Sequence, residues 1–110
     1  MKKLVQGDIV YTDLYPTVGH EQSGIRPVLI LGNASCDKFS GMSIICPITT
    51  NTREYPTKVE ILGNKIKGFV LCDQIRALDF SEREYTYIET IDEDTLWNVV
   101  DTVEGLINIL

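Results

Sequence analysis

The stretch GDIVYTDLYPTVGHEQSGIRPVLIL, residues 7–31, sets the pattern for the whole chain. Its two flanks, Asp8–Asp13 and Arg26–Leu31, are rich in Val, Ile, Leu and Tyr, which favour β-strands. The segment between them, Tyr15–Ile25, is long and polar and contains two glycines, although a tight turn would be enough to join two strands. Long loops of this kind tend to carry function, whereas composition alone favours an ordinary solvated loop.

Further short segments of the same character follow this opening and predict an all-β unit. They are separated by clusters of Gly, Asn, Pro and Ser, which are typical of turns. We expect strands over Met42–Thr49, Lys58–Leu62, Phe69–Cys72 and Tyr85–Glu89, with a short one over Ile75–Leu78.

The C-terminal segment has a different period. Apolar residues recur there at steps of three and four, which predicts an amphipathic helix: Leu96, Val99, Val100, Val103, Leu106, Ile107 and Leu110. Asp92 is the expected N-cap, and Glu93 and Asp94 place negative charge in the first turn, where the helix dipole favours it. The apolar stripe must pack against the sheet or against a partner chain.

Size and composition indicate one folded domain over residues 1–110. Hydrophobic residues make up 44% of the chain and charged residues 24%, close to the average for globular proteins. There is no internal repeat or linker to suggest a second domain. No apolar run approaches the ~20 residues of a membrane span, and the first residues lack the apolar core of a secretory signal. We therefore expect a cytoplasmic protein with no membrane partner.

The cysteines predict neither a disulfide framework nor a metal site. Cys36, Cys46 and Cys72 are odd in number and have no CxxC spacing. Their count permits a Cys3His site with His20, but zinc ligands usually come in close sequence pairs. Burial as small hydrophobic side chains is the simpler interpretation, because Cys46 and Cys72 lie inside apolar segments. We expect no metal and no cofactor.

The net charge of −6 has the wrong sign for a protein that coats nucleic acid by neutralising phosphates. Any nucleic-acid interface must therefore be local. One central stretch carries Arg53, Lys58, Lys65 and Lys67, while Asp and Glu are concentrated in the last third of the chain.

Three blocks of sequence, in the expected order, resemble the MazF/PemK family of bacterial toxins. The first is the opening stretch itself, with its G-D start and its E-Q-S-G-I-R-P-V segment. The second is CPITTNTREYPTKVEI, and the third is VLCDQIRALD. Together with the C-terminal helix these blocks span nearly the whole chain.

The resemblance implies a mainly β fold: an SH3-like barrel of the CcdB/MazF type, made of bent antiparallel strands with a C-terminal α-helix. It also implies a homodimer that cleaves single-stranded RNA at specific sequences and is neutralised by a MazE-like antitoxin protein. DNA would be contacted only indirectly, through the antitoxin complex. Matching the family motifs residue by residue assigns catalysis to Arg26, Thr49 and Glu21.

Each assignment makes chemical sense in a metal-independent cleavage by the 2′-OH of the RNA. The Arg26 guanidinium stays protonated and suits phosphate oxygens, Thr49 offers a hydroxyl at a strand end, and Glu21 is a candidate base. Each also has a simpler interpretation: an ion-paired arginine, an ordinary strand threonine and a solvated loop carboxylate. His20, where the family usually has serine, is a further candidate base, but an exposed or base-stacking histidine is the simpler interpretation.

Contacts to RNA are expected from polar side chains that can hydrogen-bond the exposed edges of unpaired bases: Gln22, Ser23, Thr50, Asn51 and Gln74. Ser23 stands where the family usually has Gly or Ala. Tyr15 and Tyr55 could stack on a base, although tyrosines in a small barrel are more often part of its packed wall.

Two other functions are compatible with the same fold. CcdB toxins share the barrel and bind DNA gyrase without cutting RNA, so the fold alone does not separate them. A plain SH3-like interaction module would need an aromatic groove, but aromatic residues are scattered and make up only 8% of the chain. The E-Q-S-G-I-R-P-V loop and the Ile-Thr-Thr step favour the ribonuclease.

Overall fold

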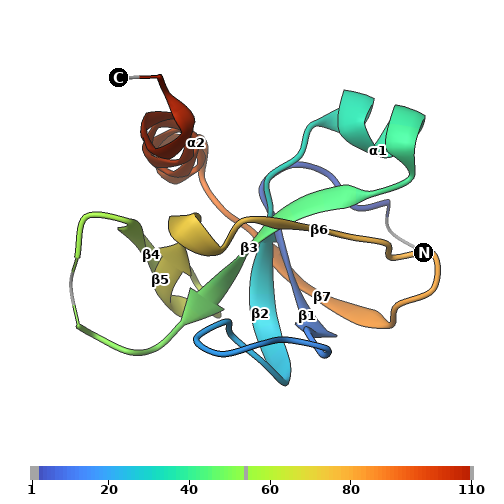
Figure 1. Ribbon diagram of the computed structural model, residues 1–110, viewed down its shortest axis with the longest axis horizontal. Coiled ribbons are helices and arrows are strands. Elements are labelled where there is room, and N and C mark those ends of the chain that lie inside the picture. The colour runs from blue at the N-terminus through green and yellow to red at the C-terminus, as the bar shows by residue number, and fades with distance from the viewer. Residues whose placement is uncertain (1–2, 54, 110) are drawn as a thin grey trace.

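The fold is an antiparallel sheet of seven strands with a helix at the end of the chain (Figure 1). The computed structural model describes residues 3–53 and 55–109. Its elements are β1 (Asp8–Asp13), β2 (Ile25–Ile30), α1 (Ala34–Ser40), β3 (Ser43–Thr49), β4 (Lys58–Leu62), β5 (Lys67–Leu71), the 3-10 turn η1 (Cys72–Gln74), β6 (Arg76–Leu78), β7 (Tyr85–Thr90) and α2 (Glu93–Ile107).

The strands pair in the order β4-β5-β3-β2-β1-β7, and β6 pairs with β3. β3 bends through the middle of this arrangement: its first residues pair with β6, and its last two, Ile48 and Thr49, pair with β5. In the described part of the chain β4 and β7 do not pair with each other, so the barrel-like sheet stays open. The predicted mainly β, SH3-like class with a C-terminal helix is confirmed.

The core lies on both faces of β1 and β2. Successive strand residues point to opposite faces, so Ile9 joins the cluster beneath α2 while Val10 joins the cluster on the other side. From α2 only Val99 and Val103 are buried; Leu106 and Ile107 remain 47% and 73% exposed. Leu110, the last residue of the predicted stripe, lies outside the described residues.

The Gly-Asp step that opens β1 ties three parts of the chain together. Gly7 has a φ of 97°, a conformation that glycine adopts at little cost. The buried Asp8 carboxylate accepts hydrogen bonds from the backbone N of Val5 (2.9 Å) and the Oγ1 of Thr90 (2.7 Å). The step therefore fixes the ends of β1 and β7 relative to each other.

Apart from shifts of one or two residues in strand bounds, the structure differs from the sequence-based expectations in two elements. α1 was not predicted; it is held by local polar bonds, such as Ser40 Oγ to the carbonyl of Cys36 (2.7 Å). Cys72, predicted at the end of a strand, instead begins η1, although its backbone N still donates to the carbonyl of Thr57 (3.0 Å), next to the Lys58–Leu71 pair of β4 and β5. No helix among the described residues has the length and apolar character to cross a membrane.

Candidate active site

Arg26 and Thr49 lie at the same end of two neighbouring strands. β2 and β3 are antiparallel neighbours, paired from Val28 opposite Pro47 to Ile30 opposite Ile45. Arg26 is near the start of β2 and Thr49 is the last residue of β3, so antiparallel pairing brings the two ends together. The structure thus places side by side two strand ends that are separated in sequence by a helix and a loop.

The Arg26 side chain is exposed and is oriented by the loop that precedes it. Its Nε donates to the carbonyl of Ser23 at 3.0 Å. This bond uses one corner of the guanidinium, and the two terminal nitrogens are further donors that suit phosphate oxygens. Within the described part of the chain, Arg26 is bonded to a backbone carbonyl and not to an acidic side chain.

Thr49 is a buried polar residue, with 8% of its surface exposed. Its Oγ1 accepts a hydrogen bond from the backbone N of Asn51 at 3.2 Å, which fixes the hydroxyl oxygen at the strand end. Gly68 on β5 presses against it: a Cβ added to Gly68 would lie 2.5 Å from the carbonyl oxygen of Thr49. Only glycine therefore allows β5 to pass this close to the strand end.

Lys58 organises the segment that follows Thr49. Its Nζ donates to the carbonyls of Asn51 (3.1 Å) and Arg53 (2.6 Å). The same ammonium lies 4.7 Å from the ring centre of Tyr55 and 5.4 Å from that of Phe69, within range of a cation–π contact. Asn51, a predicted RNA contact, is exposed in this segment, as is Thr50.

Glu21 sits in the loop between β1 and β2. Its Oε1 accepts from the backbone N of Val18 at 2.5 Å, and its own N donates to the carbonyl of Val18 at 3.2 Å. The side chain is exposed and, with the neighbouring Gln22 and with Gln74, lines a cavity of about 350 Å³. The cavity is completed by Pro16, Pro47, Asp73, Ile75 and Arg76.

The loop and η1 are joined directly. The backbone N of Gln22 donates to Oε1 of Gln74 at 2.8 Å, and Nε2 of Gln74 donates to the carbonyl of His20 at 3.3 Å. The structure thus brings together two of the predicted RNA contacts, Gln22 and Gln74, beside the predicted base. Thr50 and Asn51 lie elsewhere, in the segment that follows Thr49 at the end of β3.

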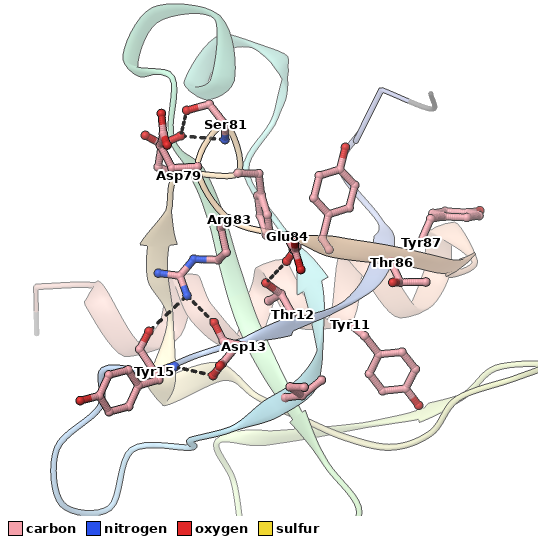
Figure 2. Close-up of a pocket in the computed structure, with 14 residues that line it drawn as sticks. Tyr11, Thr12, Asp13, Tyr15, Asp79, Ser81, Arg83, Glu84, Thr86 and Tyr87 are labelled. Carbon is pink, nitrogen blue, oxygen red and sulfur yellow. Dashed lines mark hydrogen bonds between the residues drawn. The ribbon is translucent and has the colours of Figure 1, made fainter.

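Sequence reasoning missed two arginines that hold the base of the loop. Nη1 of Arg76 donates to the carbonyl of Leu14 at 3.2 Å. Nη1 of Arg83 donates to the carbonyl of Asp13 and, at 3.4 Å, to that of Tyr15, so its guanidinium points at the start of the loop (Figure 2). The resemblance of the third block included Arg76, but its bonding partner could not be read from the motif.

A larger groove of about 1270 Å³ lies on the β7 side, where Figure 2 shows its lining. Its walls include the carboxylates of Asp13, Asp79, Glu82 and Glu84, against the single cation of Arg83. None of the predicted catalytic residues is among its lining residues. Because Glu21 lines the smaller cavity, and Arg26 and Thr49 lie at neighbouring strand ends, we take these as the candidate site.

Cys46 and Cys72 are buried as predicted, whereas Cys36 on α1 is half-buried. Burial raises the pKa of the Cys46 thiol to about 12, and burial with the nearby Asp73 charge raises that of Cys72 to about 11. Among residues 3–53 and 55–109, no group of three or more His, Cys, Asp or Glu side chains is arranged to hold a metal ion. The Cys3His arrangement permitted by the residue count is therefore not formed there.

The sequence matches one family model over residues 5–107, described as PemK-like, MazF-like toxin of type II toxin-antitoxin system. Endoribonuclease MazF of Staphylococcus saprophyticus is 37% identical over 109 residues, covering 92% of this chain and 91% of that protein.

Solved structures agree with the sequence match. The crystal structure of MazF from Deinococcus radiodurans has a TM-score of 0.87 and 30% identity, covering 96% of this chain and 97% of that one. A crystal structure of MazE–MazF from the same organism has a TM-score of 0.79 and 25% identity, covering 97% of both chains. The similarity therefore extends over nearly the whole chain, and the family match over residues 5–107 includes all three blocks that contribute to the candidate site.

Proposed function

The chain belongs to the PemK-like, MazF-like toxins of type II toxin–antitoxin systems, and from this membership we propose that it is a sequence-specific, metal-independent endoribonuclease that cleaves single-stranded RNA. The observation that carries the proposal is that the start of β2, with Arg26, and the end of β3, with Thr49, lie side by side next to the loop that presents Glu21. A cation, a hydroxyl and a carboxylate in this arrangement suit phosphodiester cleavage.

The proposed reaction uses the RNA as its own nucleophile. The 2′ oxygen forms a bond to the adjacent phosphorus and gives up its proton to a base, while the bond from phosphorus to the 5′ oxygen breaks and that oxygen takes up a proton. The products are a 2′,3′-cyclic phosphate and a 5′-OH end. The protein then needs only to align the attack, move protons and stabilise charge on the phosphoryl oxygens.

Arg26 and Thr49 are assigned to the phosphoryl oxygens. The Nε bond to Ser23 fixes the plane of the Arg26 guanidinium, so its terminal nitrogens can donate to two oxygens at once. The Thr49 oxygen already accepts from Asn51 N, which leaves its O–H to donate to a phosphoryl oxygen. Both groups act by stabilising the charge that develops in the transition state.

Glu21 is assigned as the base for the 2′-OH. Its Oε1 is held by the backbone N of Val18, which fixes the carboxylate, and Oε2 is the oxygen that takes the proton. Gln22, Ser23, Thr50 and Asn51 are the proposed RNA contacts around these three residues.

The proposed partners follow from the same family membership. A MazE-like antitoxin is expected to neutralise the enzyme, as suggested by the MazE–MazF structure that the fold resembles. The active form is proposed to be a homodimer, and DNA is contacted only through the antitoxin complex. Because the substrate is cellular RNA, the proposed place of action is the cytoplasm.

The decisive experiment incubates the purified protein with long single-stranded transcripts in excess EDTA, with Arg26→Ala in parallel and Lys38→Ala on α1 as a folded control. We expect fragments ending in cyclic phosphate from the wild type and from Lys38→Ala. Arg26→Ala should be slower by on the order of 100-fold or more, the usual cost of removing one charge-stabilising donor.

Primer extension and end-group analysis identify the sites and the chemistry. Intact RNA from the wild type across several transcripts contradicts the proposal and favours a CcdB-like toxin that binds gyrase. Cleavage that stops in EDTA contradicts metal independence.

A further inference from the structure

The loop from Leu14 to Gly24 is held at its base and through its own backbone. Leu14 N donates to the carbonyl of Gly24 at 3.0 Å, which closes the loop. Near the tip, the bonds between Val18 and Glu21 form a local turn. Gly19 has a positive φ of 59°, and no heavy atom lies within 4 Å of a Cβ built on it. Local bonds of exposed backbone do not by themselves hold a loop in one place, because water competes for them.

Arg26, just after the loop, bonds the carbonyl of Ser23 within it. From farther along the described chain, three side chains of the segment 74–83 bond the loop: Gln74, Arg76 and Arg83. Arg76 and Arg83 bond the carbonyls of residues 13–15 and so hold the base of the loop, as Figure 2 shows for Arg83. Gln74 alone of these three residues reaches the tip, where it bonds the residues on either side of Glu21. Gln74 therefore holds the part of the loop that carries the proposed base, Glu21.

The Gln74 amide can both accept from and donate to the backbone of the loop. Its carbonyl oxygen accepts from Gln22 N at 2.8 Å, and its NH₂ group donates to the carbonyl of His20 at 3.3 Å, so both polar ends of the side chain are engaged. A carboxylate would lack the donor and an amine would lack the acceptor.

The turn that carries Gln74 is anchored in the core. It is the last residue of η1, whose first residue, Cys72, is fully buried and donates its N to the carbonyl of Thr57 at 3.0 Å. Thr57 lies in the segment that follows Thr49. The short turn η1 therefore links the loop that carries Glu21 to the segment that follows Thr49.

We propose that Gln74 is a positioning residue that holds the tip of the loop and thereby fixes the Glu21 carboxylate relative to Arg26 and Thr49. This inference rests on the proposed ribonuclease function. It differs from the sequence-based assignment of Gln74 to RNA contact, because both polar ends of its amide are already bonded to the loop, and loss of the bond from Gln22 would leave a half-buried N–H without its partner.

The first test needs no RNA. Amide hydrogen exchange at Gln22 is measured in the wild type, in Gln74→Met, and in Gln6→Met as a matched control, since the Gln6 amide bonds the carbonyl of Leu31 far from the loop (2.9 Å). We expect exchange at Gln22 to rise about fivefold or more in Gln74→Met, the effect of losing one hydrogen bond. Exchange at Leu14, and exchange in Gln6→Met, should stay as in the wild type. Unchanged exchange at Gln22 overturns the proposal.

The second test separates positioning from base reading. For Gln74→Met we expect kcat to fall on the order of 10- to 100-fold, as for a displaced catalytic group. Affinity for an oligonucleotide with 2′-deoxyribose at the mapped cleavage site should stay within about threefold of the wild type, since no base contact is lost. Gln74→Glu keeps the acceptor for Gln22 and should recover part of the rate.

A loss of affinity together with a changed set of cleavage sites would assign Gln74 to base reading and overturn the positioning role. If the wild type cleaves no RNA, the ribonuclease proposal fails, while the exchange measurement still decides whether Gln74 holds the loop.

Discussion

At the scale of single residues, Thr49 shows how a strand residue becomes a candidate catalytic group. Its backbone pairs with Phe69 like any other strand residue, but its hydroxyl points to the turn that follows and accepts from Asn51 N. Burial of all but 8% of its surface and the bond from Asn51 hold the hydroxyl oxygen in place. A fixed donor needs no reorganisation when charge develops on the phosphate.

Replacing Thr49 with valine tests this role with little change of shape. Thr49→Val keeps the branched side chain but loses the hydroxyl, so we expect cleavage to slow on the order of 100-fold, the cost of one lost transition-state donor. Thr49→Ser keeps the hydroxyl and should retain most of the rate. Single-turnover cleavage of a mapped RNA measures both variants, and equal rates for valine and serine would remove Thr49 from the mechanism.

The candidate site was only partly predictable from the sequence. Arg26, Thr49 and Glu21 could be proposed because each stands in a motif, at or next to a strand end. The bonds of Gln74 could not, because its partners Gln22 and His20 are 52 and 54 residues away and belong to a loop without regular structure. Side chains that bond irregular backbone do not recur at regular steps, so no pattern in the sequence reveals them.

At the scale of secondary-structure elements, Glu89 on β7 closes the turn between β4 and β5. Its carboxylate accepts from the backbone N of Asn64 (3.0 Å), Lys65 (2.8 Å) and Ile66 (2.7 Å). Burial by itself raises the pKa of Glu89, but the three N–H donors, with the Lys65 charge, outweigh it and lower the pKa. The carboxylate thus joins two strands that are not paired with β7.

We expect Glu89→Gln to destabilise the fold in a pH-dependent way. Because the folded pKa is lowered, the carboxylate contributes stability above its ordinary pKa and loses it as the pH falls through the folded value. The variant should lose about 1–2 kcal/mol near pH 7, from the lost charged acceptor, and less near pH 3, below the ordinary glutamate pKa. Urea unfolding at both values measures this, with the exposed Glu60→Gln on β4 as control. An equal loss at both pH values would contradict the assignment.

The fold was more predictable than the site because its elements have regular periods. β1 and β4 were predicted with the bounds that the structure shows, and α2 was predicted with its N-cap, where Asp92 accepts from Thr95 N at 2.9 Å. β5 begins at Lys67, two residues before its predicted start, since Lys67 and Gly68 resemble a turn in sequence. α1 has no apolar stripe to reveal it.

At the scale of the whole molecule, the exposed apolar end of α2 predicts the homodimer. Leu106 and Ile107 are 47% and 73% exposed although they continue the stripe that buries Val99 and Val103. We expect light scattering at micromolar concentration to give twice the chain mass of 12.4 kDa, and Ile107→Asp to shift the mass towards the monomer. A monomeric wild type would exclude the dimer at that concentration.

The close passage of Gly68 beneath the Thr49 carbonyl also has a genetic consequence. Any change at the first or second position of a glycine codon replaces the residue, and every replacement adds a Cβ where only 2.5 Å is available. In cells that survive only by losing a toxic gene product, codon 68 should therefore accumulate escape mutations alongside codons 26 and 49. A position with no chemistry of its own would thus appear, in a survival screen, as essential as the catalytic ones.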